Sequence, residues 1–264
     1  MSIEISRGDG PVLLGLPHTG TEIPEPYLSR LNDTGRAIAD TDWHIHVLFD
    51  GLLDGATTVR TRTHRYVVDV NRSPSGDSLY PGQNTTGTCP LTDFDGHGIY
   101  LPGQEPDETD IATRLALFHA PYHSAMQAEI ARIRDRHGIA ILFDCHSIRS
   151  HIPYLFDGTL PVLNLGTNAG ASCAPALQQA AWDIARTSPF EAVANGRFKG
   201  GWTTRHYGQP GRHVHALQME IAQRAYLAAE SPPWDYDPVK ADALRGTLRQ
   251  MLETLRDTAM EMPR

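Results

Sequence analysis

Two histidines follow short apolar runs in a way that could build a metal site. Residues 11–17 (PVLLGLP) are followed by His18, and residues 139–143 (IAILF) are followed by Asp144-Cys145-His146. Such runs are typical of buried strands, and in open α/β sheets sites form at the carboxyl ends of the strands. Zinc favours imidazole nitrogen, and a catalytic zinc keeps three protein ligands and one open position. His18 and His146 are therefore predicted to supply two of three metal ligands.

The pattern leaves the third ligand open. Asp42 and Asp40 lie at the start of a predicted helix, and Glu22 and His44 are further candidates in the same part of the chain. Asp42 also has a purely structural interpretation, because an Asp at the start of a helix often only caps backbone amides.

Residues of two further apolar runs could bind and process an anionic substrate. Asn71-Arg72 closes a predicted strand, where an Arg can hold a carboxylate through two parallel hydrogen bonds and Asn adds a neutral donor. A surface Arg72–Asp69 pair is the alternative. Glu220 lies within the apolar run 214–221 (VHALQMEI), and a buried carboxylate needs a partner or a function. It could be a general base beside a metal, or half of a buried salt bridge.

The elements predicted to position these residues alternate between strands and helices. Further strands are predicted at 58–70, 160–165 and 190–195, and helices at 39–53, 107–136, 174–185 and 238–260. Pro121 is expected to kink or split the helix at 107–136. Residues 73–103 are rich in Gly, Pro, Asn, Asp and Thr and are predicted to form a long loop. The alternation indicates an α/β fold with a largely buried, partly parallel sheet, in one domain over residues 1–264.

The composition excludes some partners. The chain has 31 acidic and 23 basic residues, a formal charge of −8 and no cluster of Lys and Arg, which argues against nucleic acid and membrane partners. Positive charge that attracts an anionic substrate must then be local. The three cysteines lack CxxC spacing, and with no signal-like N-terminus we expect a cytoplasmic protein. Seven of the 13 histidines are predicted to occupy ordinary surface or core positions: His64, His97, His119, His137, His151, His206 and His213.

Nine segments along the chain resemble the N-formylglutamate amidohydrolase (deformylase) family. In chain order they are 17–20 (PHTG), 40–44 (DTDWH), 65–72 (RYVVDVNR), 78–87 (SLYPGQNTTG), 120–123 (APYH), 143–150 (FDCHSIRS), 164–170 (NLGTNAG), 195–208 (NGRFKGGWTTRHYG) and 215–221 (HALQMEI). Because these segments cover nearly the whole chain in order, the resemblance is specific.

The resemblance implies a zinc carboxypeptidase-like fold, with three layers formed by a mixed, mostly parallel, twisted sheet and helices on both faces. It implies one zinc ion per chain, held by His18, Asp42 and His146. Another divalent metal would also suit these ligands. Glu220 corresponds to the glutamate that activates water. The family's wider group places a Glu nearer the first histidine, where this chain has Thr21 and then Glu22, so the preference for Asp42 over Asp40 and Glu22 rests on the matching segment.

The implied reaction is hydrolysis of N-formyl-L-glutamate to formate and L-glutamate in histidine degradation. Asn71 and Arg72 correspond to the pair that binds a substrate carboxylate, and Arg149, Arg205 and Arg197 are candidates for the second carboxylate. We expect a monomer or small homo-oligomer. One alternative is a related zinc deacylase or small peptidase that acts on another N-acyl acidic amino acid. A non-catalytic binding protein is a weaker alternative, because binding alone does not need Glu220 beside two histidines.

Overall fold

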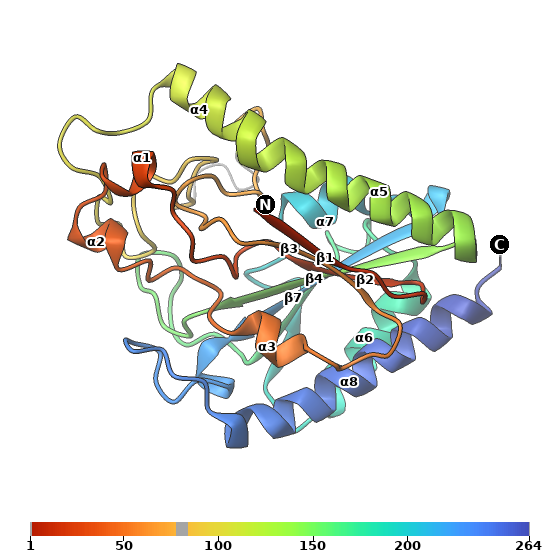
Figure 1. Ribbon diagram of the computed structural model, residues 1–264. Helices are drawn as coiled ribbons and strands as arrows, with labels where there is room; N and C mark the ends of the chain where they lie inside the picture. The colour runs from red at the N-terminus through yellow and green to blue at the C-terminus, as the bar shows by residue number, and fades with distance from the viewer. Residues whose placement is uncertain (1, 78–83, 264) are drawn as a thin grey trace.

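The computed structural model describes residues 2–77 and 84–263, so residues 78–83 of the predicted segment 78–87 lie outside the described residues. Within the described residues, a mixed sheet of seven strands forms the centre of the molecule (Figure 1). The pairs β1–β3 and β7–β5 are antiparallel, and the other neighbours, including the edge pair β5–β6, are parallel. The spatial order is β1 (Ile3–Ser6), β3 (Thr57–Thr61), β2 (Val12–Leu16), β4 (Ala140–Ile148), β7 (Val214–Ala222), β5 (Leu163–Gly166) and β6 (Ala192–Ala194).

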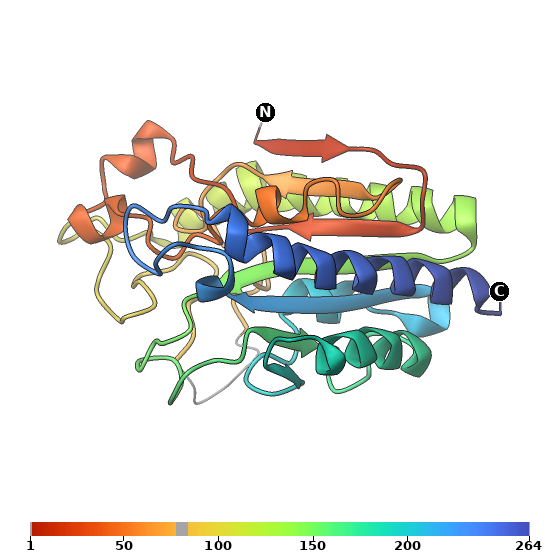
Figure 2. The same ribbon diagram turned by 90° about the horizontal axis from the view of Figure 1, so that it is seen from below.

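Helices cover both faces of this sheet, which confirms the predicted three-layer α/β architecture (Figures 1 and 2). One face carries α4 (Glu108–Arg114), α5 (Ala120–His137) and α7 (Trp202–Tyr207); the other carries α3 (Ile45–Phe49), α6 (Pro175–Thr187) and α8 (Pro238–Glu261). Two short helices, α1 (Glu25–Leu28) and α2 (Asp33–Arg36), precede α3, and 3-10 turns occupy Pro210–Arg212 and Gln223–Ala225. Across the described residues, every helix is too short or too polar to cross a bilayer.

The two faces of strand β4 contact two different parts of the core. Ile141, Phe143 and Cys145 belong to the core under α3, α6 and α8, whereas Leu142 packs toward α5. Because side chains alternate along a strand, Asp144 and His146 share the α5-facing side with Leu142. The apolar layer on that side therefore gives way to polar residues toward the carboxyl end of β4.

Three predicted boundaries are wrong, each for a local reason. Strand β3 ends at Thr61 rather than 70, because the chain turns at His64, whose Nδ1 accepts from the Tyr66 amide at 3.1 Å. Helix α3 starts only at Ile45, after His44 adopts a left-handed φ of 57°. Strand β4 continues to Ile148, since β7 pairs with it along its whole length, so His146 lies within the strand.

The helix predicted at 107–136 is one long rod that changes its winding. Between α4 and α5, Leu115–His119 form a π-helical turn in which the Ala120 amide donates to the Leu115 carbonyl. Pro121 is the second residue of α5 and has no N–H to continue the ladder, so the expected disturbance is a change of winding rather than a break. Gly138, with a φ of 74°, ends α5.

Stability should fall in acid partly because of His215, at the start of β7. Burial lowers its pKa to about 4, and its Nδ1 accepts from the Ala174 amide at the N-terminus of α6 at 3.2 Å. The unfolded chain takes up this proton near pH 6.5, so the stabilisation is complete above pH 6.5 and is lost as the pH falls toward 4. His215→Gln should reduce the stability difference between pH 7.5 and pH 5 by about 1–2 kcal/mol. Urea unfolding at the two pH values measures this; an unchanged difference would show that His215 titrates normally.

Candidate active site

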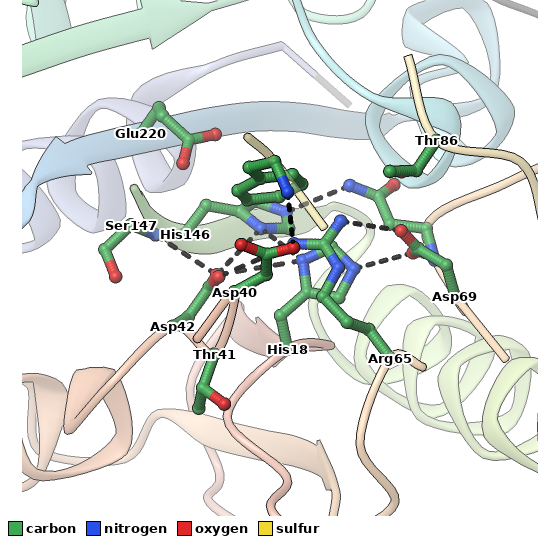
Figure 3. A network of polar contacts seen from close by, with 12 residues as sticks. His18, Asp40, Thr41, Asp42, Arg65, Asp69, Thr86, His146, Ser147 and Glu220 are labelled. Carbon is green, nitrogen blue, oxygen red and sulfur yellow. Dashed lines mark hydrogen bonds and ion pairs between the residues drawn. The ribbon is translucent and has the colours of Figure 1, made fainter. Parts of the chain in front are cut away.

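The two predicted histidines and Asp42 converge at one point at the carboxyl edge of the sheet (Figure 3). His18 follows β2, His146 lies in the neighbouring strand β4, and Asp42 lies on the segment before α3, where its amide donates to the His18 carbonyl. The His146 Nδ1 lies 3.2 Å from both the His18 Nδ1 and the Asp42 Oδ2, and the last two atoms are 3.7 Å apart. All three side chains are at most 3% exposed.

These three atoms have the spacing that a metal ion requires. Two ligand atoms, each about 2.0–2.1 Å from a tetrahedral zinc, lie about 3.3 Å apart. The opposite ring nitrogens both face carboxylates, with His18 Nε2 2.6 Å from Asp69 and His146 Nε2 3.2 Å from Asp144. A metal-binding histidine usually donates its other N–H to such a carboxylate. The residues therefore fit a divalent metal bound through both Nδ1 atoms.

The pKa shifts of the clustered residues also fit a bound divalent metal. Burial alone would raise the pKa of Asp42, but its hydrogen bonds to His146 and His18 hold it below its usual range. Burial would lower the pKa of His146, but Asp144 and Asp42 raise it well above its usual range. The site thus holds a positive charge among carboxylates, and a divalent cation would replace that proton.

Asp69 and Arg65 complete the cluster and were not predicted as site residues. Both are at most 5% exposed, and their side chains are 2.6 Å apart. Burial favours the neutral form of Asp69, but Arg65 and His18 hold its pKa well below the usual range. Arg65 also lies 3.9 Å from Asp42 and stacks over Phe94, its guanidinium 4.8 Å from the ring centroid. This ion pair holds His18 in place and brings a cation to the group formed by His18, Asp42 and His146.

Glu220 shares the face of the sheet that carries His146, because the two residues are partners in the β4–β7 register. It is 6% exposed, and burial raises its pKa to about 7, an effect that His146 partly offsets. The Gln218 Nε2 donates to Glu220 Oε2 at 2.9 Å, while its Oε1 accepts from the Gly201 amide at 2.6 Å. Among the described residues, Glu220 forms no ion pair with Arg or Lys within 4.0 Å, which argues against the salt-bridge alternative. A pKa near neutrality suits a general base.

A cavity of about 260 Å³ opens over these residues. Its polar lining includes His18, Asp42, His146 and Glu220, together with three arginines, Arg65, Arg72 and Arg197, and the Asn71 amide. The Asn71 Oδ1 accepts from the Thr203 backbone amide at 2.9 Å, and the Asn71 Nδ2 lies 3.1 Å from His146 Nε2. The cavity therefore brings three arginines together in an acidic chain, beside the carboxylates of Asp42, Asp77 and Glu220.

Two predicted arginines lie outside the residues that line this cavity. Arg149 pairs with Asp95 at 2.8 Å, and the Arg205 Nε donates to the Gly200 carbonyl at 2.9 Å. Arg197, from the loop after β6, lines the cavity and donates to the Leu155 carbonyl at 3.3 Å. Substrate contacts of Arg149 and Arg205 stay predictions, and the geometry favours Arg197.

The rival third ligands lie elsewhere. The Asp40 Oδ2 accepts from the Tyr66 hydroxyl at 2.7 Å and from the Phe94 amide at 2.9 Å. Glu22 is exposed and pairs with Arg62. The His44 Nε2 lies 2.9 Å from the Trp234 carbonyl. Among these candidates Asp42 alone belongs to the histidine cluster.

Comparison with known proteins agrees with this geometry. A model of the family described as N-formylglutamate amidohydrolase matches residues 10–227. The N-formylglutamate deformylases of Pseudomonas aeruginosa and Pseudomonas putida are 46% and 40% identical to this chain over 255 residues, which is 96% of this chain and 95% of each relative. The crystal structure of an N-formylglutamate amidohydrolase from Ralstonia eutropha shares the fold, with a TM-score of 0.78 at 19% identity over 97% of this chain and 96% of that one.

The fold and the relatives define an amidohydrolase built on a mixed α/β sheet. The chain belongs to the N-formylglutamate amidohydrolase family.

Proposed function

We propose that this enzyme hydrolyses N-formyl-L-glutamate to formate and L-glutamate with one bound zinc ion, as a cytoplasmic step of histidine degradation. The observation that carries the proposal is the convergence of His18, Asp42 and His146 with Glu220 in one cation-lined cavity. The names of the relatives identify the substrate class, and the negative charge of that substrate matches Arg72 and Arg197.

The imidazole and carboxylate donors of His18, His146 and Asp42 suit zinc. When bound there, zinc supplies Lewis acidity toward a carbonyl oxygen and toward water. Glu220 accepts a proton from the attacking water while the water oxygen forms a bond to the formyl carbon. The same carboxyl then delivers the proton to the amide nitrogen as the C–N bond breaks, which gives formate and the free amine. Arg65 is the cation nearest the metal ligands and stabilises the developing oxyanion.

The substrate has two carboxylates, and the cavity offers a cation for each. Arg72 and Asn71 bind one carboxylate, and Arg197 binds the other from the loop after β6. Gly201 leaves room for the Asn71 side chain, because a Cβ at position 201 would lie only 2.5 Å from the Asn71 Nδ2.

Arg72→Ala should weaken the use of N-formyl-L-glutamate by about 2–5 kcal/mol in kcat/KM, the cost of removing one partner of a desolvated charge pair. The loss should be much smaller on an analogue of the substrate in which the carboxylate that Arg72 binds is replaced by a neutral amide. Formate release from the two substrates measures the difference. An equal loss on both substrates would indicate that Arg72 is only structural.

The alternative activity, on another N-acyl acidic amino acid, is tested by a substrate panel assayed with the same protein. N-formyl-L-glutamate should give the highest kcat/KM, above N-acetyl-L-glutamate and N-acetyl-L-aspartate. A preference for an acetylated substrate would replace the deformylase assignment with the related deacylase.

A further inference from the structure

Residues 66–72 reach the active site without forming a strand or helix, so their backbone carbonyls need other partners. This segment carries Asp69, which binds His18, and the substrate-binding pair Asn71 and Arg72. Its backbone therefore sets the geometry of two parts of the site.

Three buried side chains of the α4–α5 rod bind these carbonyls. The Arg114 Nη1 donates to the Val67 carbonyl at 3.1 Å, and the His123 Nε2 lies 2.8 Å from the Val70 carbonyl. The His119 Nε2 lies 2.9 Å from the carbonyl of Arg72 itself. We refer to Arg114, His119 and His123 as the carbonyl-binding face.

Carbonyl partners fix the role of each imidazole. A carbonyl oxygen only accepts, so both histidines must carry hydrogen on Nε2 and donate it. His123 Nδ1 then accepts from the Tyr207 hydroxyl at 2.9 Å. Both rings are at most 6% exposed, and they lie against each other with centroids 4.4 Å apart and against Trp202 of α7. Their orientation is therefore set by packing as well as by hydrogen bonds.

The π-helical turn explains how these three residues share a face. His119 and His123 are four residues apart, as neighbours on a helix surface are, but Arg114 and His119 are five apart. In an ordinary α-helix that spacing would turn them to different sides. The turn Leu115–His119 absorbs the extra residue, because its bonds run from residue i to i+5. Such turns occur frequently at functional sites.

We propose that the carbonyl-binding face is a positioning device: through the backbone of residues 67–72, it holds Arg72 and Asn71 at the angle that binds a substrate carboxylate. His119 acts most directly of the three, because it binds the carbonyl of Arg72, a residue that lines the cavity. The inference rests on the proposed function through the role of Arg72. The histidines do not touch the substrate; they act on affinity through Arg72.

A matched pair of variants isolates the hydrogen bond from the packing. His119→Met keeps a long side chain without a donor, and His119→Gln keeps an N–H donor. His119→Met should raise KM for N-formyl-L-glutamate by about 3- to 10-fold, with kcat changed less and zinc content unchanged. His119→Gln should recover most of the KM. The pair His123→Met and His123→Gln repeats the test at the Val70 carbonyl if His119→Met does not fold.

The decisive step is the double variant with Arg72→Ala. If His119 acts through Arg72, His119→Met should change KM little once Arg72 is absent. The same factor in both backgrounds would overturn the inference, as would a KM rise of equal size in His119→Gln and His119→Met. Failure of the proposed function looks different, because the parent protein would then release no formate from this substrate in any background.

Discussion

Glu220→Gln is expected to bind zinc as the parent does and to lose turnover by ~10²–10⁴, the usual contribution of a positioned base. The substitution keeps the shape of the side chain and its contact with Gln218 but removes the group that accepts a proton. Substrate affinity should change little, because the substrate carboxylates are held by Arg72 and Arg197. Zinc content, KM and kcat of the purified variant give the three required quantities.

Glu129 provides a matched control. Like Glu220 it is a buried carboxylate, but it lies on α5 rather than on β7. It pairs with Arg132 at 2.6 Å and Arg7 at 2.7 Å, and Arg132 also binds Thr57 at the start of β3, away from the carboxyl edge that carries the active site. Glu129→Gln should lower the free energy of unfolding and leave kcat near the parent value. If Glu220→Gln behaves like this control, with lower stability and near-normal turnover, Glu220 is not the base.

His146→Ala is expected to lose both metal and activity while it stays folded. His146 supplies the central atom of the ligand triangle, 3.2 Å from each of the other two, and two remaining ligands hold zinc poorly. Strand β4 keeps its backbone pairing with β7 in this variant, so the sheet should form. Metal analysis after dialysis and a circular dichroism spectrum check the two halves of the prediction.

Two further variants show how zinc binding should depend on the residue that is changed. Asp144→Asn removes only the carboxylate behind His146 Nε2, and it should weaken zinc binding by about 10–100-fold rather than abolish it. His215→Gln, a buried histidine elsewhere on β7, should bind zinc as the parent does. Parent-like zinc affinity in His146→Ala would show that the ligand assignment is wrong.

The grouping of His18, His146 and Glu220 could be predicted because the signal of each is local. Each is a polar residue in or directly after a continuous apolar run, and such runs form the central strands β2, β4 and β7. The choice of Asp42 over Asp40 could not be made from the pattern alone. It depends on the left-handed His44 and on the His18 carbonyl that binds the Asp42 amide, both of which are tertiary details.

The residues that support the site were harder to predict. Arg65 and Asp69 are four residues apart in an apolar segment, which resembles an ordinary strand with a surface ion pair. The approach of His18 from β2 is what makes Asp69 part of the candidate site. The sequence predicts only an ordinary surface or core position for His119, because its partner, the Arg72 carbonyl, is 47 residues away in the sequence.

The most direct test of this account is formate release from N-formyl-L-glutamate by the full chain before chelation, after chelation and after zinc is restored. We predict that activity disappears with the metal and returns as zinc binds at one ion per chain, while His146→Ala stays inactive throughout. Undiminished formate release from chelated protein that contains no metal would contradict the assignment of His18, Asp42 and His146 as ligands of a catalytic metal.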